Sequence, residues 1–201
     1  MLKTIDMPIK SVCVFCGSNY GLAAIYKEQA TLLGKTLAER EIDLVYGGAH
    51  VGLMGAVADG ALKAGGRVIG VLPRFLEDKE LAHTGLSELI LVDTMHQRKT
   101  TMNERCDAII TLPGGFGTMD ELFEMLTWAQ LGLHKKPIGV LNVNGYYDTL
   151  NLLTENMVAK GFLSAANKES LLISDNIDHL LESINNYQAP EAVEFITADK
   201  V

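Results

Sequence analysis

The chain has 201 residues, of which 48% are hydrophobic, and a formal net charge of −8 at pH 7. This length suits one domain, and we predict a core from about residue 10 to residue 187 followed by a loosely attached tail. Acidic residues are spread along the chain and no Lys/Arg-rich run is present, which argues against a nucleic-acid partner. A small anion can still bind where the local field is positive.

The N-terminal segment and the cysteines bear on the compartment. Residues 1–10 lack the apolar stretch of a signal peptide, and no segment is long enough to span a bilayer, so we expect a cytoplasmic protein with no membrane partner. Three cysteines are an odd number, which argues against a complete disulfide framework. Cys13 and Cys16 have the spacing of a redox or metal site, but residues three apart in a strand point to opposite faces. We therefore expect them to be structural.

Short β-branched runs alternate with longer stretches of helical spacing along the whole chain. The expected strands are residues 11–16, 43–46, 67–72, 89–92, 108–112, 137–143 and 171–174. The expected helices are residues 22–39, 53–64, 94–106, 118–131, 146–160 and 177–187. Several strands are apolar without alternation, which is typical of parallel strands buried on both faces. The sequence predicts an α/β fold, a doubly wound parallel sheet of about seven strands with helices on both faces.

Glycines follow three of these strands. Gly17 and Ser18 follow the first, Gly47 and Gly48 follow the second, and the segment 113–118 follows the fifth. Ligands of open parallel sheets bind beyond the carboxyl ends of the strands, where glycine lets an anion approach the free N–H groups of the next helix. A single glycine turn is also ordinary packing, but three at one sheet edge favour a phosphate site. The missing Gly-Lys-Ser/Thr ending excludes a Walker A loop, and the missing acidic residue after the third strand disfavours NAD.

Two charged segments allow two interpretations each. Thr118-Met119-Asp120-Glu121 has the pattern of a capping box, in which Thr118 begins the helix and Glu121 reaches back to it. The same carboxylate could instead contact a ribose or orient a water beside the phosphate site. The helix 94–106 is short of apolar residues, which is explained either by a solvated face or by a ligand site at Arg98 and Lys99.

The segments 14–18, 46–48, 95–99 and 113–121 together resemble the LOG (LONELY GUY) family of cytokinin riboside 5′-monophosphate phosphoribohydrolases. The likeness extends from about residue 10 to residue 187. It implies a Rossmann-like fold, a homodimer, and hydrolysis of the N-glycosidic bond of AMP or N⁶-modified AMP. We expect this reaction to need no cofactor or metal. Arg98 and Glu121 match the catalytic pair of the family. The residues assigned to substrate binding by this resemblance or by their place in the same segment are Glu80, Lys99, Gly114, Gly115, Phe116, Gly117, Thr118, Met119, Asp120 and Thr127.

The chemistry of this reaction agrees with the residues. Breaking the bond from C1′ to the base develops positive charge on the sugar and negative charge on the base, which calls for a carboxylate near C1′ and a positioned water. Glu121 fits either as general base or as a stabiliser of the sugar cation. Arg98 fits a contact to the phosphate, to Glu121 or to the departing base. The label "lysine decarboxylase", often used for this family, is not supported, because no segment offers a Schiff-base lysine with a partner for the pyridinium nitrogen.

Two other functions remain open from the sequence. A glycine cradle of this kind can serve a non-catalytic nucleotide or phosphate carrier or sensor. The same site can also serve a transferase that passes ribose 5-phosphate to an acceptor other than water.

Overall fold

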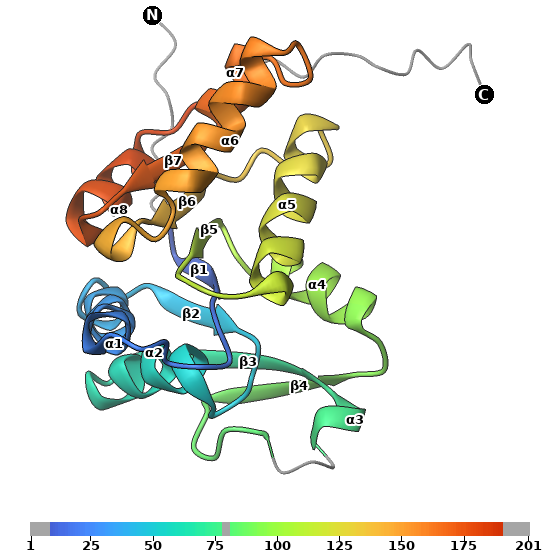
Figure 1. Ribbon diagram of the computed structural model, residues 1–201. Coiled ribbons are helices and arrows are strands. Elements are labelled where there is room, and N and C mark those ends of the chain that lie inside the picture. The colour runs from blue at the N-terminus through green and yellow to red at the C-terminus, as the bar shows by residue number, and fades with distance from the viewer. Residues whose placement is uncertain (1–8, 78–80, 191–201) are drawn as a thin grey trace, which may run out of the picture.

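The computed structural model describes residues 9–77 and 81–190 and has a seven-stranded, all-parallel sheet at its centre (Figure 1). The strand order is β4-β3-β2-β1-β5-β6-β7. The strands are β1 (Ser11–Phe15), β2 (Asp43–Tyr46), β3 (Val68–Pro73), β4 (Glu88–Val92), β5 (Ala108–Thr111), β6 (Ile138–Leu141) and β7 (Leu171–Ser174). The chain winds outward from β1 to one edge and from β5 to the other. This order confirms the predicted doubly wound, Rossmann-like sheet and puts the topological switch point between β1 and β5.

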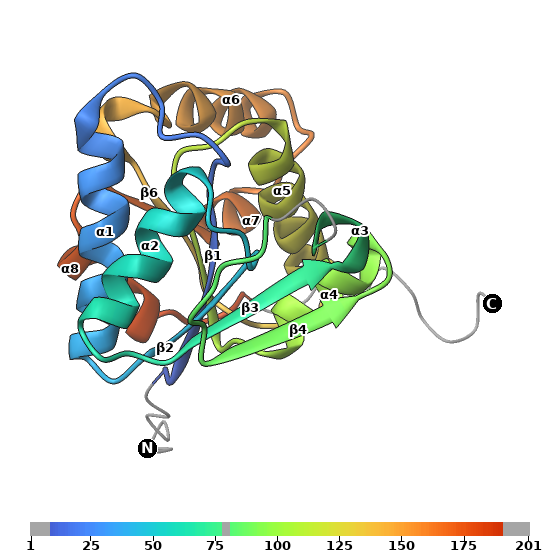
Figure 2. The same ribbon diagram turned by 90° about the horizontal axis from the view of Figure 1, so that it is seen from below.

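Helices cover both faces of the sheet (Figures 1 and 2). They are α1 (Ala24–Glu39), α2 (Gly52–Lys63), α3 (Arg74–Glu77), α4 (Met95–Glu104), α5 (Phe116–Gln130), the 3₁₀ turn η1 (Val143–Gly145), α6 (Asp148–Ala159), α7 (Ala165–Glu169) and α8 (Ile177–Asn185). One hydrophobic core lies under α1, α2 and α8, and a second under α4, α5 and α6. No helix in the described ranges is long and apolar enough to cross a membrane.

Alternate residues of β1 contribute to the two cores. Val12 and Val14 belong to the first core, whereas Cys13 and Phe15 belong to the second. Cys16, three residues beyond Cys13, is a free thiol in the first core, on the opposite face. The prediction that Cys13 and Cys16 point to opposite faces of the sheet is thereby confirmed.

The main differences from the predicted elements are two short helices and the starts of α1, α5 and α6, each of which lies two residues from its predicted position. The helices α3 and α7 were not predicted, because they have only four and five residues and bury none of them. The helix α5 begins at Phe116, two residues before the predicted start, with Gly115 as its N-cap. This shift matters for the site, because it moves Thr118 and Glu121 further into the helix.

The helices α1 and α2 lie side by side on the first face (Figure 2) and touch through glycines. A Cβ atom at Gly34 of α1 would collide with the carbonyl oxygen of Val57 in α2. We therefore expect Gly34→Ala to lower the free energy of unfolding by about 1–3 kcal/mol, because the two helices must separate. Urea unfolding checks this, and Gly117→Ala serves as the comparison, because it adds the same methyl group to a helix without a collision and should not lower the stability. Equal stability of Gly34→Ala and the wild type would show that the helix pair tolerates the extra methyl group.

Candidate active site

A cleft of about 430 Å³ opens at the carboxyl ends of β1 and β5, at the switch point of the sheet. Its volume lies within the range of small-molecule sites. The predicted site residues that line it are Gly17, Ser18, Arg98, Gly114, Gly115, Phe116, Gly117, Thr118, Asp120 and Glu121. Segments that lie far apart in the sequence thus meet in one cavity.

The glycines of the cleft are of two kinds. Gly17 and Gly114 pack closely: a Cβ at Gly17 would lie 3.2 Å from the Gly114 Cα atom, and a Cβ at Gly114 would collide with the Thr118 hydroxyl. The Gly17 N–H also donates to the Pro113 carbonyl at 3.0 Å. Gly115 and Gly117 differ, because a Cβ at either position would have no described atom within 4 Å. The backbone at these two positions therefore stands open to the cleft, as a phosphate-binding loop requires.

Of the two interpretations of Thr118 and Glu121, the capping box is wrong. Gly115 caps α5 without a side-chain hydrogen bond, so Thr118 is the third helical residue and Glu121 the sixth. Glu121 has turned toward α4 instead of reaching back to the helix start. A capping box does occur at Thr94 and Gln97, at the start of α4. Its Thr-x-x-Gln pattern is a sequence signature from which this helix start could have been predicted.

Arg98 and Glu121 form a buried ion pair inside the cleft. The Arg98 Nη1 atom lies 2.5 Å from Glu121 Oε1, and its Nε donates to the Val71 carbonyl of β3 at 3.2 Å. Arg98 is only 8% exposed and Glu121 only 7%. Gly47, at the end of β2, lies behind the guanidinium, and a Cβ there would collide with Arg98 Nη2. Gly47 thus makes room for the arginine.

Burial raises the pKa of the Glu121 carboxyl, and the Arg98 guanidinium opposes this shift without cancelling it. The pKa therefore stays above the ordinary value of 4.5. A carboxylate with a raised pKa, held in a cleft by a single arginine, is typical of a general base.

Several predicted site residues lie away from the lining of the cleft. Gly48 has a φ of +76° and packs on Val71 and Leu72 of β3, and Met119 packs against the second core. The Lys99 ammonium lies between two carboxylates of α5, 2.7 Å from Glu124 Oε2 and 3.1 Å from Asp120 Oδ2. Glu80 lies outside the described residues.

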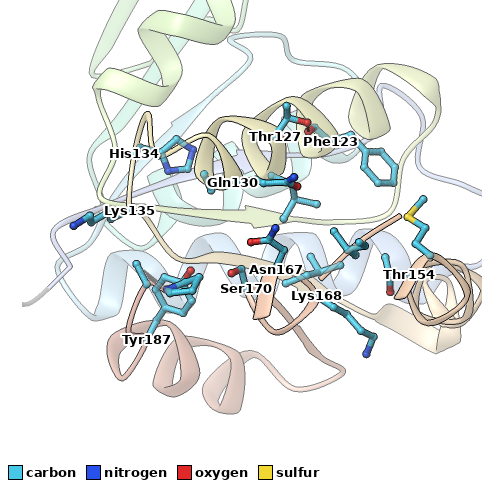
Figure 3. Close-up of a pocket in the computed structure, with 18 residues that line it drawn as sticks. Phe123, Thr127, Gln130, His134, Lys135, Thr154, Asn167, Lys168, Ser170 and Tyr187 are labelled. Atoms are coloured by element: carbon cyan, nitrogen blue, oxygen red, sulfur yellow. Dashed lines mark hydrogen bonds between the residues drawn. The ribbon is translucent and has the colours of Figure 1, made fainter. Parts of the chain in front are cut away.

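Thr127 lies in a second cavity of about 200 Å³, between the C-terminal half of α5 and the segment of α6, α7 and β7 (Figure 3). Its hydroxyl donates to the Phe123 carbonyl at 2.7 Å, within its own helix. A ligand contact by Thr127 therefore stays a prediction.

The cleft also has an aromatic rim, which is not among the predicted site residues. Tyr20, Tyr26 and Tyr146 line it, and the rings of Tyr26 and Tyr146 meet edge to face at 6.0 Å. The Tyr146 hydroxyl donates to the Gly114 carbonyl at 2.6 Å and so braces the glycine turn. Tyr146 follows β6, the strand next to β5, so the rule that ligands bind beyond strand ends could have found it.

We expect Gly117→Ala to change stability and binding in opposite directions. Alanine favours the helix that glycine weakens, so the free energy of unfolding should rise by up to about 1 kcal/mol. The same methyl group would occupy the space that is open to a phosphate, so the Kd for AMP should rise about tenfold or more. Urea unfolding and calorimetric titration with AMP measure the two effects. Unchanged AMP affinity would place the phosphate elsewhere.

Solved structures with a similar fold include two proteins of low sequence identity. A molybdenum cofactor binding protein from Rippkaea orientalis matches with a TM-score of 0.68 and 22% identity, covering 90% of this chain and 98% of that one. The molybdenum cofactor carrier protein of Chlamydomonas reinhardtii matches with a TM-score of 0.67 and 20% identity, covering 88% and 96%. At this identity the likeness shows the shared fold alone.

The sequence comparisons are more specific. A family model described as "Possible lysine decarboxylase" matches residues 54–184. The cytokinin riboside 5′-monophosphate phosphoribohydrolase LOG2 of Arabidopsis thaliana is 42% identical over 188 residues, covering 94% of this chain and 88% of the relative. The probable phosphoribohydrolase LOGL1 of Oryza sativa subsp. japonica is 46% identical over 176 residues, covering 88% and 79%. The chain therefore belongs to the LOG family of cytokinin riboside 5′-monophosphate phosphoribohydrolases, which are glycosidase-type hydrolases.

Proposed function

We propose that the protein hydrolyses the N-glycosidic bond of AMP or N⁶-modified AMP and releases the free base and ribose 5-phosphate. The observation that carries this proposal is the buried Arg98–Glu121 pair, which lies in the same cleft as the open backbone of Gly115 and Gly117. A carboxylate beside an anion cradle is what cleavage of a phosphorylated nucleoside needs. Membership of the family supports the same reaction.

The proposed binding mode begins with the phosphate at the start of α5. The first N–H groups of that helix lack acceptors within the helix, and its dipole favours a negative charge there. Glu121 follows Gly117 by four residues, about 6 Å along a helix that rises 1.5 Å per residue. That distance is comparable with the span of a ribose 5-phosphate, so C1′ would lie near the carboxylate. The base would then lie against the aromatic rim of Tyr20, Tyr26 and Tyr146.

The proposed chemical step is attack of a water on C1′. The Glu121 carboxylate accepts a proton from the water, the new C1′–O bond forms, and the electron pair of the C1′–N bond leaves with the base. The base takes up a proton from the solvent, and Glu121 releases its proton to the solvent, which regenerates the carboxylate. Glu121 also faces the positive charge that develops on the sugar. Arg98 holds the carboxylate in its ionised form and fixes its direction through the bond to Val71.

Base release decides the proposal. The purified protein is incubated with AMP and, separately, with isopentenyladenosine 5′-monophosphate, and the free base and ribose 5-phosphate are measured. We expect both products in equal amounts from at least one substrate. A nucleotide that binds but survives for hours would indicate a carrier or sensor. Base release that accelerates when an alcohol or amine acceptor is added would indicate a transferase.

We also propose that the protein is a cytoplasmic homodimer. Phe116 lines the mouth of the cleft, yet its side chain is 96% exposed, and Met95 beside it is 40% exposed. Large apolar side chains at a ligand site are typically covered, and a second subunit would cover them. Sedimentation velocity gives the mass in solution, and a monomer at micromolar concentration would contradict the proposal.

A further inference from the structure

Arg98 and Lys99 are consecutive residues of α4, but their side chains diverge. Arg98 enters the cleft, whereas Lys99 lies outside the set of residues that line it. The Lys99 side chain is only 8% exposed, and its ammonium contacts Glu124 and Asp120 of α5 at 2.7 and 3.1 Å. A lysine that bound a phosphate by itself would instead be expected to face the open cradle at Gly115 and Gly117.

The two cations of α4 contact two adjoining sides of α5. Asp120 and Glu124 are four residues apart and so lie on one side of α5, where Lys99 binds both. Glu121 points to the neighbouring side, where Arg98 binds it. The helix that carries the arginine is therefore fixed to the helix that carries the carboxylate by a second ion pair beside the first.

The opposite charges favour the contact of Lys99 with α5 and make its separation costly. Burial alone would lower the pKa of the Lys99 ammonium, but the ion pair with Glu124 and the hydrogen-bonded ion pair with Asp120 outweigh it, and the pKa is raised. Withdrawing the ammonium toward a phosphate would leave two neighbouring carboxylates facing each other without a cation. Glu124 is itself largely covered, with 23% of its side chain exposed, so its charge would be poorly solvated.

We propose that Lys99 is a positioning residue which, together with Asp120 and Glu124, fixes α4 against α5 so that Arg98 stays on the Glu121 carboxylate. It acts through Arg98 and does not hold the phosphate of the substrate. This inference rests on the proposed function for its kinetic consequence, while its structural content concerns the free protein.

The first test compares Lys99→Met, Glu124→Gln, Lys99→Arg and the double variant Lys99→Met/Glu124→Gln. We expect Lys99→Met to lower kcat for base release from AMP by about ten- to a hundredfold while the KM changes little, because small displacements of catalytic groups are costly. Glu124→Gln should lower kcat in the same way, and the double variant should have a kcat no lower than that of Lys99→Met. Lys99→Arg should recover most of the lost activity.

The control is Lys35→Met, which removes the exposed pair with Glu39 on α1. A large rise in KM with kcat retained in Lys99→Met, and wild-type behaviour of Glu124→Gln, would identify Lys99 as a phosphate contact and overturn the proposal.

The second test needs no turnover. The Glu121 carboxyl is titrated by ¹³C NMR without substrate, in the wild type and in Glu124→Gln. The groups that face Glu121 are Arg98 and Lys99 from α4, Asp120 from its own helix, and the buried thiols of Cys13 and Cys16 from β1. We expect the pKa of Glu121 to rise in Glu124→Gln, because a loosened Arg98 opposes the effect of burial less. An unchanged pKa would overturn the proposal. If the wild type released no base, the proposed function would fail while this titration would still decide the role of Lys99.

Discussion

Replacement of Glu121 by glutamine is expected to lower base release from AMP by about 10³-fold, in a protein that still folds and still binds the nucleotide. Glutamine keeps the size of the side chain and an oxygen that can accept the hydrogen bond from Arg98. It cannot accept a proton from water, and general bases of this kind contribute about 10²–10⁴-fold. The measurement is the single-turnover rate of adenine release, together with the Kd for AMP from calorimetry.

The matched control for this variant is Glu182→Gln on the exposed surface of α8, which should behave as the wild type. Because Gly115 caps α5, no loss of helix capping is expected in Glu121→Gln. Turnover within threefold of the wild type would exclude Glu121 as the base. Loss of AMP binding together with activity would mean that Glu121 serves binding.

Replacement of Arg98 by methionine should lower kcat/KM at pH 7 by about 10²–10³-fold and move the acidic limb of its pH profile upward. Burial raises the pKa of Glu121, and Arg98 is the main opposing charge, so its removal raises that pKa further. Activity requires the ionised carboxylate and therefore grows as the pH rises through the pKa. At pH 7 the variant holds a smaller ionised fraction, and part of its activity should return at higher pH.

The raised pKa of Glu121 in Arg98→Met should also change how the free energy of unfolding depends on pH. A carboxyl with a folded-state pKa above its unfolded value binds its proton more tightly in the folded protein. Arg98→Met should therefore be most stable, relative to the wild type, at acid pH, and should lose that stability as the pH rises through the folded-state pKa. Thermal unfolding at several pH values and the pH profile of kcat/KM check both statements. The control is Arg105→Met, because Arg105 lies at the end of α4 and its contact with Glu88 is exposed. An acidic limb at the wild-type pH in Arg98→Met would show that the pair does not govern catalysis.

The sheet could be predicted because its strands carry their own signal. Runs such as Ser11–Phe15 and Ile138–Leu141 are apolar on both faces, and all seven strands were found in order, since parallel strands between two helix layers need no polar face. The helices α3 and α7 carry no such signal, because one or two turns with no buried residue show no hydrophobic period.

The place of the site could be predicted from the sequence, whereas the directions of its side chains could not. The glycine turns lie beyond strand ends by topology, so the place of the cleft followed from the strand order. The start of α5 did not follow, because contacts from distant residues hold its turn: Gly17 binds Pro113, and Tyr146 binds Gly114. The opposite directions of Arg98 and Lys99 depend on the rotation of α4 about its axis. A helix with only two clearly apolar residues, Met95 and Met102, does not define that rotation in its sequence.

The Arg98–Glu121 pair joins the two halves of the doubly wound sheet. Arg98 belongs to the half that runs from β1 through β4, where it also binds the Val71 carbonyl of β3, whereas Glu121 belongs to the half that begins with β5. Each half by itself has the βαβ architecture of a mononucleotide-binding unit, but neither contains both members of the pair. The full sheet is therefore needed to bring the carboxylate and the guanidinium together, because a polypeptide containing either half alone would lack one member of the pair.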